Sequence, residues 1–266
     1  MSTIARFYDD LADDYHLNYA DWHEAVPRQG KVLAQLIRNR LGNSDAETLL
    51  DCSCGIGTQA IGLALEGFDV TGTDLSPKSV ARARREAAAF GVTVEWGVAD
   101  VRNLTVDVPG KFDVVISCDN SLPHLLTDDE LALALANMYA KAKPGGMMVI
   151  GIRDYDLLSR ERPRFTPPRI IEKGDSNSVL FQLWDWVEDG SSYDVTLFVH
   201  KRTLGAWTSR THTATYRALK RDELAHFASQ AGVSDIQWSF PDVTGHHQPL
   251  MTARKPLETK DIHDCI

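Results

Sequence analysis

The chain has 266 residues, enough for one large domain or for a domain that carries an insertion. Its 28 basic and 37 acidic residues give a formal net charge of −9, which disfavours a surface that follows nucleic-acid phosphates. The first residues lack the apolar core of a signal peptide, and no apolar run is long enough to cross a bilayer. We therefore expect a cytoplasmic protein that binds neither nucleic acid nor membrane.

Two helices are predicted before the first strand. Apolar and aromatic residues recur at helical spacing over residues 6–17 and again over residues 23–41. Pro27 suits the first turn of the second helix, and Gly42 suits its end. We assign residues 1–45 to an N-terminal helical cap.

Strands and helices then alternate as far as residue 152. Short apolar runs predict strands at residues 48–52, 69–73, 93–98, 112–118 and 147–152. Helices are predicted between them at residues 58–66, 76–91 and 127–141. Pro144-Gly145-Gly146 is predicted to turn the chain into the fifth strand. This alternation implies parallel strands with helices on both faces of the sheet.

The pattern changes after residue 153. Alternating apolar and polar residues predict a three-stranded antiparallel insertion at residues 179–187, 192–201 and 208–217. A helix at 221–230 and an antiparallel strand pair at 235–240 and 250–254 follow. The predicted class is α/β, with a Rossmann-like, seven-stranded, mostly parallel sheet that ends in an antiparallel hairpin. The sheet domain takes residues 46–153 and 218–256, the insertion 154–217 and a frayed tail 257–266.

The first two predicted strands end in residues that suit a nucleoside. Cys54, Gly55 and Gly57 follow the first strand, and glycine lets the backbone pass close to a ligand and open a helix N-terminus. Asp74 ends the second strand, where a carboxylate can accept hydrogen bonds from ribose hydroxyls. The layout predicts a pocket for an adenine nucleoside or dinucleotide.

Five motifs extend this layout between residues 48 and 152. They are Asp51-Cys52-Ser53-Cys54-Gly55-Ile56-Gly57, Asp74, Asp100, residues 112–118 and Lys143-Pro144-Gly145-Gly146. In order and spacing they resemble a class I S-adenosylmethionine-dependent methyltransferase, although Ser53 stands where that family often has glycine. The resemblance implies S-adenosylmethionine as cofactor and S-adenosylhomocysteine as product. It disfavours a nicotinamide oxidoreductase, in which the Pro-Gly-Gly turn and the antiparallel hairpin are not expected.

Two short motifs follow the fourth and fifth strands, namely Asn120-Ser121-Leu122-Pro123-His124-Leu125 and Arg153-Asp154-Tyr155-Asp156. Both resemble the glycine and sarcosine N-methyltransferase group. This resemblance implies that the acceptor-binding residues are Asn120, His124, Arg153 and Tyr155. It also implies that residues 154–217 form a lid over the acceptor. A simple structural role for His124 in its loop remains open.

The family resemblance further implies a set of cofactor-binding residues: Tyr15, Trp22, Arg28, Cys54, Gly55, Gly57, Asp74, Leu75, Asp100, Val101 and Cys118. Asp74 would hold the ribose, and Asp100 with the amide of Val101 would hold the adenine. Arg28 would pair with the cofactor's carboxylate, and Tyr15 and Trp22 would face the sulfonium. Packing or solvent-exposed roles remain open for Tyr15, Trp22 and Arg28.

His246 and His247 precede the last predicted strand. Adjacent histidines on a loop usually point in different directions, and the four cysteines lack zinc-site spacing, so no metal is expected. A histidine that faces the acceptor would take its proton near neutral pH. Otherwise the site only aligns a neutral nucleophile, and Tyr15 contributes by positioning.

The leading hypothesis is methyl transfer from S-adenosylmethionine to a nitrogen of an amino acid or amino-acid-derived small molecule. The alternative enzyme would methylate a carbon of an indole ring in a tryptophan-derived natural product, a reaction of secondary metabolism. A larger, aromatic-lined cavity would favour the ring, and a small pocket in which Arg153 grips a carboxylate would favour the amino acid. A non-catalytic cofactor-binding module or assembly partner is the alternative of another class. A homo-oligomer is compatible with the sequence.

Overall fold

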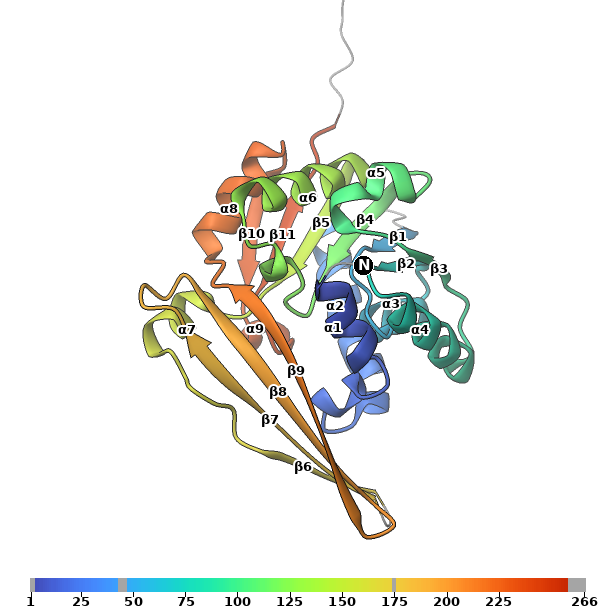
Figure 1. The fold of residues 1–266 in the computed structure, drawn as a ribbon. Coiled ribbons are helices and arrows are strands. Elements are labelled where there is room, and N and C mark those ends of the chain that lie inside the picture. The colour runs from blue at the N-terminus through green and yellow to red at the C-terminus, as the bar shows by residue number, and fades with distance from the viewer. Residues whose placement is uncertain (1–2, 43–46, 174–175, 258–266) are drawn as a thin grey trace, which may run out of the picture.

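A mixed seven-stranded sheet forms the centre of the computed structural model, which describes residues 3–42, 47–173 and 176–257. The strands lie in the order β10-β11-β5-β4-β1-β2-β3 (Figure 1). Their bounds are β1 Thr48–Asp51, β2 Asp69–Asp74, β3 Glu95–Val98, β4 Phe112–Ser117, β5 Ala142–Gly151, β10 Ser234–Ser239 and β11 Leu250–Arg254. β1 to β5 pair in parallel, whereas β11 runs antiparallel to β5 and to β10. The predicted mostly parallel sheet with an antiparallel last hairpin is confirmed.

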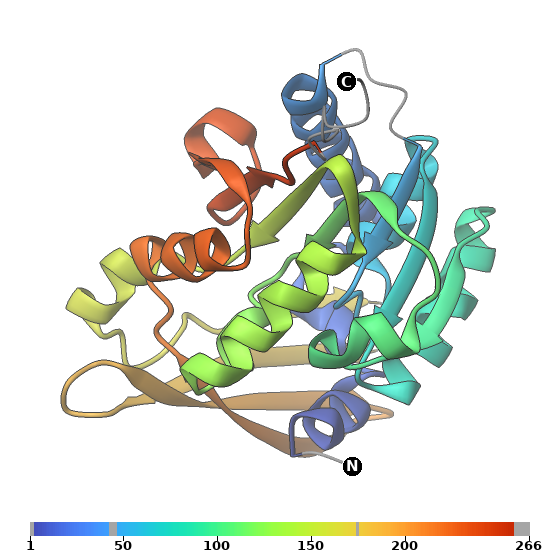
Figure 2. The ribbon, with the colours of Figure 1, turned by 90° about the horizontal axis from the view of Figure 1, so that it is seen from above.

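Helices cover both faces of this sheet (Figure 2). The longer ones are α2 (Trp22–Leu41), α3 (Thr58–Leu65), α4 (Pro77–Phe90), α6 (Asp128–Lys141) and α8 (Arg221–Gln230). Successive residues of β4 point to opposite faces, so Val114 packs in one core cluster with Leu33 of α2, and Val115 packs in another with Leu135 of α6. Burial on both faces explains why β4 reads as a continuous apolar run.

The N-terminal segment differs from its prediction. α1 spans Thr3–Leu11 and a short 3-10 turn spans Tyr15–Asn18, so the single helix expected at residues 6–17 is wrong. The break falls at Asp14, whose buried carboxylate pairs with Lys201 of the second sheet. A buried carboxylate needs a partner of opposite charge. We attribute the end of helix α1 before Asp14 to this pairing with Lys201. α1 then lies against strand β9 of that sheet (Figure 1).

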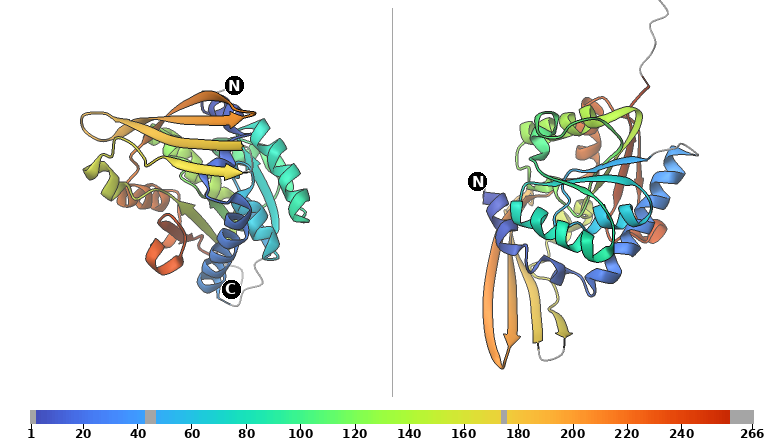
Figure 3. Two further views of the ribbon diagram at one scale, coloured as in Figure 1. Left: turned by 90° about the horizontal axis from the view of Figure 1, so that it is seen from below. Right: turned by 90° about the vertical axis from the view of Figure 1, so that its right-hand side faces the viewer.

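The insertion is a separate sheet with four strands, not the expected three. They are β6 Arg169–Lys173, β7 Ser176–Trp186, β8 Ser192–Thr203 and β9 Ala206–Arg217, all antiparallel. β6 follows Pro167 and Pro168 and has no alternation of apolar and polar residues, which is why the pattern missed it. Helix α7 (Tyr155–Glu161) connects β5 to this sheet. Figure 3 shows the far end of the sheet projecting beyond the helices.

The Pro-Gly-Gly motif lies inside β5 and does not precede it. Phe112 pairs with Ala142 and Val114 pairs with Met147, so the motif forms a bulge in which β5 has more residues than β4. Gly145 has φ +76°, and a Cβ on Gly146 would lie 2.8 Å from Lys143 O. The backbone here therefore requires glycine, as a turn would, which is why the motif resembled a turn.

Short elements and the chain end complete the description. The short helices are α5 Leu104–Asp107 and α9 Pro241–Thr244, and the other 3-10 turns are Val101–Asn103 and Leu122–His124. Of the tail predicted at residues 257–266, only Leu257 lies within the described residues. None of the described helices is both long enough and apolar enough to cross a membrane.

Candidate active site

Two adjoining cavities open at the carboxyl ends of the parallel strands. The first, of about 310 Å³, is bordered by the loops after β1, β2, β3 and β4 and by α1. The second, of about 390 Å³, lies between the N-terminal segment, the second sheet and the loop before β11. Tyr8, Tyr15 and Asp119 line both cavities. Ligands in open α/β sheets bind at this end of the strands, so the two cavities are the candidate site.

The two glycines of the turn after β1 serve different purposes. Gly55 has φ +52°, lines the first cavity beside Cys54, and has open space where a side chain would be. Gly57 has φ +94° and does not line either cavity. A Cβ on Gly57 would lie 2.8 Å from Ile61 and 3.1 Å from Trp96. Gly55 therefore leaves room for a ligand, whereas Gly57 lets α3 pack closely against its neighbours.

Asp74 joins the glycine turn to the end of β2. One carboxylate oxygen accepts the Gly55 amide at 2.8 Å, and the other accepts the Ser76 amide at 2.8 Å. Burial raises the pKa of Asp74, and these two amides partly offset that rise. Asp74 and Leu75 both line the first cavity. The carboxylate retains free lone pairs for further donors.

Asp100 follows β3 at the far end of the first cavity, next to Val101. Arg102 donates to both of its carboxylate oxygens, at 2.6 and 3.0 Å, and also pairs with Glu130 at 2.5 Å. Burial alone would raise the pKa of Asp100, but the hydrogen bonds and charge of Arg102 lower it below its ordinary value. Arg102 thus fixes the orientation of this carboxylate, a contact that the sequence analysis did not anticipate.

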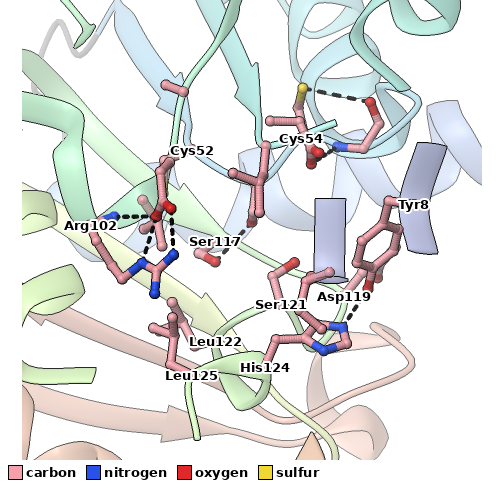
Figure 4. Close-up of a pocket in the computed structure, with 18 of the residues that line it drawn as sticks. Tyr8, Cys52, Cys54, Arg102, Ser117, Asp119, Ser121, Leu122, His124 and Leu125 are labelled. Atoms are coloured by element: carbon pink, nitrogen blue, oxygen red, sulfur yellow. Dashed lines mark hydrogen bonds and ion pairs between the residues drawn. The ribbon is translucent and has the colours of Figure 1, made fainter. Parts of the chain in front are cut away.

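Tyr8 and His124 form a hydrogen-bonded pair on the wall of the first cavity (Figure 4). Tyr8 Oη lies 2.7 Å from His124 Nε2, and His124 Nδ1 lies 3.3 Å from the carbonyl oxygen of Thr215. Burial lowers the pKa of His124 to about 4, so the ring is neutral near pH 7. With the Nδ1 proton directed to the carbonyl oxygen of Thr215, Nε2 accepts a hydrogen bond from the Tyr8 hydroxyl. Tyr8 was not among the predicted site residues.

Asp119 lies where the two cavities meet and was also missed by the sequence analysis. Its backbone has φ +55°, and its side chain is 12% exposed. Tyr19 donates to one carboxylate oxygen at 2.5 Å, and His247 Nε2 lies 3.0 Å from the other. Burial alone would raise the pKa of Asp119, but His247 and Tyr19 hold it well below its usual range. Asp119 is therefore an ionised carboxylate in the wall between the cavities.

The two adjacent histidines occupy different environments. His247 lines the second cavity, with 42% of its side chain exposed. His246 is 2% exposed and lines neither cavity. Burial, together with the neighbouring His247, lowers the pKa of His246 to about 4. Only His247 is therefore placed to exchange a proton with a molecule in the second cavity.

Arg153 lies on the wall of the second cavity among aromatic rings. Its guanidinium donates to the Tyr193 hydroxyl at 2.8 Å and lies over Trp184 at 4.9 Å and over Tyr216 at 5.3 Å. Among the described residues it has no acidic partner within ion-pair distance. A partly buried cation without a counter-ion suits an anionic ligand group.

The remaining predicted residues lie behind or beside the cavity walls. Asn120 and Tyr155 are buried and hydrogen bonded to each other at 2.9 Å, and Asn120 also accepts the Arg153 amide at 2.9 Å. Trp22 is buried and donates to Thr58 at 2.9 Å. The residues that line neither cavity are Trp22, Gly57, Cys118, Asn120, Tyr155 and His246. Arg28 lines the second cavity and not the first.

Residues 49–146, which carry the glycine turn and most of the first cavity, match the family described as "Methyltransferase domain". This segment resembles methyltransferase domains. The chain is 34% identical over 152 residues to a glycine/sarcosine N-methyltransferase of Parasynechococcus marenigrum, a match that covers 57% of this chain and 52% of the relative. It is 38% identical over 124 residues to the glycine N-methyltransferase of Rattus norvegicus, covering 41% of each chain. The chain thus matches about half the length of these curated relatives.

Solved structures share the fold of this chain. DesVI of Streptomyces venezuelae superposes with a TM-score of 0.75 at 21% identity, covering 92% of this chain and 98% of that one. The sugar N-methyltransferase KedS8 of Streptoalloteichus superposes with a TM-score of 0.71 at 20% identity, covering 86% and 87%. At these identities the likeness shows the fold alone. With the sequence matches, it places the chain beside class I S-adenosylmethionine-dependent methyltransferases.

One buried acid near the glycine turn after β1 predicts a pH effect on stability. Asp51 is 1% exposed, and burial raises its pKa to about 8. A carboxyl whose pKa is higher in the folded chain stabilises that chain fully below its unfolded pKa, and the contribution is lost as pH rises through about 8. Asp51→Asn should therefore gain stability relative to the unmutated chain as pH rises from 5 to 8, by up to about 1.4 kcal/mol per unit. Urea titrations at several pH values measure this, and parallel stability curves would contradict it.

Proposed function

We propose that the protein transfers the methyl group of S-adenosylmethionine to a nitrogen of a small molecule that carries an anionic group. The observation that carries this proposal is the pair of cavities joined at Tyr8, Tyr15 and Asp119. The first cavity would hold the cofactor, residues 46–153 and 218–256 would form the domain that binds it, and residues 154–217 would cover the acceptor in the second. The open space at Gly55 fits a ligand that passes close to the backbone.

The cofactor residues take roles that follow from their positions. Asp74 would accept the ribose hydroxyls, since its backbone contacts orient both oxygens. Asp100, oriented by Arg102, would accept the adenine amino group, with the Val101 amide at a ring nitrogen. Cys54 and Leu75 would contact the cofactor at the cavity wall, and Trp22, Gly57 and Cys118 would support it from behind. Arg28 would act on the acceptor side.

The junction residues would align the reaction. When bound, S-adenosylmethionine supplies a methyl on a sulfonium, and the carbon–sulfur bond breaks as the new carbon–nitrogen bond forms. Asp119 would accept an N–H of the acceptor and so direct the nitrogen lone pair across the junction. Its negative charge would also stabilise the ammonium that forms, because the Asp119 side chain is only 12% exposed. His247 would then receive the proton and pass it to solvent through its exposed edge.

A second candidate function, C-methylation of an indole ring, draws support from the same cavity. Aromatic side chains of Phe7, Tyr8, Tyr15, Tyr19 and Tyr216 line it beside Arg28, Arg153 and Arg169. Stacking on these rings would suit an indole, and the arginines would suit its carboxylate. The carboxylate is common to both candidates, whereas the methylated atom differs between them.

A substrate panel tests the proposed function. Labelled S-adenosylmethionine is incubated with amino acids, amines, and indoles with and without a carboxylate, and the product is identified by mass and fragmentation. We expect methylation of an acceptor with a carboxylate, and Arg153→Gln should raise its KM by about tenfold to a hundredfold with a smaller change in kcat. Arg153→Lys keeps the charge and should retain part of the affinity. Equal turnover of acceptors with and without the anionic group would contradict the role of Arg153.

Cofactor binding is predicted to depend on Asp74. A hydrogen bond to a charged group contributes about 1.5–3 kcal/mol, so Asp74→Ala should weaken binding of S-adenosylhomocysteine by about tenfold to a hundredfold. Calorimetry measures this, and NAD should not bind either chain. Asp69→Ala, at the exposed start of the same strand, is the matched control and should bind normally. Unchanged affinity in a folded Asp74→Ala variant would exclude this role.

A further inference from the structure

The cluster of Asp119, His246 and His247 could also bind a metal ion, which methyl transfer does not require. One ring nitrogen of each histidine and one carboxylate oxygen of Asp119 all lie within 4.8 Å of one another. His247 and Asp119 line the second cavity, and His246 lies behind them. Two imidazoles and a carboxylate are a common ligand set for a divalent transition-metal ion.

The hydrogen bonds around His246 leave one nitrogen free. Nδ1 lies 3.2 Å from the carbonyl oxygen of Gln248 and 3.3 Å from the Gln248 amide nitrogen, so the two tautomers of the ring have different partners there. In the tautomer that binds a metal, Nδ1 carries the proton and donates it to the carbonyl oxygen. Nε2 then has the lone pair in that tautomer, and in either tautomer it is buried without a hydrogen-bond partner among the described residues. A backbone carbonyl on one ring nitrogen is the usual outer contact of a metal-binding histidine. A buried polar atom without a partner calls for an explanation, and a bound ion is one that fits an imidazole nitrogen.

The carboxylate has a similar outer contact. Tyr19 donates to one oxygen of Asp119 at 2.5 Å and fixes its orientation, while the other oxygen lies 3.0 Å from His247. Ligand atoms on one Zn²⁺ lie about 3.3 Å apart, so the widest spacing in the cluster must shorten. His247 can supply that movement, because its side chain is 42% exposed.

We propose that Asp119, His246 and His247 form a binding site for a divalent transition-metal ion of the Zn²⁺ class in the wall of the second cavity. The open coordination positions would face that cavity. Binding would occupy Asp119 and His247, and therefore slow methyl transfer. That inhibitory role rests on the proposed function, whereas binding of the ion does not.

Zn²⁺ and Co²⁺ titrations of the chelator-treated full chain test the site. We expect one ion per chain, visible Co²⁺ absorption bands, and no comparable binding of Mg²⁺. His246→Ala and His247→Ala each remove a ligand and should weaken Zn²⁺ binding by about a hundredfold or more, and Tyr19→Phe should weaken it by about tenfold. His226→Ala, on the exposed face of α8, is the matched control and should bind as the unmutated chain does.

The outcomes separate the site from the proposed function. Absence of binding, or equal binding by folded His246→Ala and His247→Ala variants, overturns the metal site while leaving cofactor calorimetry unaffected. His247→Ala keeps the test valid if His246→Ala fails to fold, because His247 is half exposed. Zn²⁺ that binds and inhibits, with activity restored by a chelator, supports both the site and its role. Binding that leaves turnover unchanged or raises it supports the site and overturns the inhibitory role.

Discussion

Asp119→Asn should reduce kcat by about a hundredfold or more and leave S-adenosylhomocysteine affinity within about threefold. The substitution keeps the shape of the side chain and removes its charge. That charge is the feature that would hold the acceptor N–H and stabilise the developing ammonium at the junction of the cavities. Its unusually low pKa, produced by His247 and Tyr19 against the effect of burial, means that the charge is present throughout the neutral range. Single-turnover kinetics with saturating cofactor measures the chemical step directly.

Two comparisons sharpen this test. Tyr19→Phe removes one donor to Asp119 but keeps its charge, so it should reduce kcat by only about tenfold. Tyr8→Phe alters the other side of the junction and should have a similarly modest effect through positioning. An Asp119→Asn variant that turns over within threefold of the unmutated chain would show that alignment alone suffices. In that case the proton leaves without help from the charge of Asp119.

The periodicity of the sequence predicted the parallel sheet because each central strand is buried on both faces. Val114, Val115 and Ile116 are fully buried, and such runs tolerate few polar residues. The same reasoning failed for β6, which has no alternating pattern, and for the N-terminal helix. The break there depends on an ion pair between Asp14 and Lys201, which are 187 residues apart. Propensity along the chain carries no information on such a partner.

The candidate site was partly predictable for a related reason. Gly55, Asp74 and Asp100 were identified because they stand at strand ends, and all three line the first cavity. Tyr8 and Asp119 were missed because their significance comes from contacts across the fold, with His124 and His247 respectively. One signal was available for Asp119, since it is an acid directly after the fourth buried strand. The sequence could not indicate that the backbone of Asp119 would adopt φ +55° and direct the carboxylate to the junction of the two cavities.

Gly30→Ala should destabilise the protein strongly. Gly30 of α2 lies against Gly62 of α3, and a Cβ on Gly30 would lie 2.1 Å from the Gly62 carbonyl oxygen. The Gly62 carbonyl oxygen belongs to the backbone, and the added Cβ is fixed to the backbone of Gly30, so neither atom can rotate away. Within a helix, alanine is about 1 kcal/mol more favourable than glycine. Glycine at residue 30 therefore lowers the helix propensity of α2, and the close contact with α3 explains its presence. We expect a net loss of about 3 kcal/mol in unfolding free energy, measured by urea titration.

The same substitution should also affect the site. α2 carries Arg28 on the second cavity, and α3 begins at the glycine turn that borders the first. Pushing the helices apart would shift the two cavity walls relative to each other, so S-adenosylhomocysteine affinity should fall as well. Gly97→Ala is the matched control, because a Cβ there would meet only Thr73 at 3.3 Å and the change should cost less than about 1 kcal/mol. Equal stability of the two variants would mean that the helices can separate freely, and the close packing of α2 on α3 would then not set the geometry of the site.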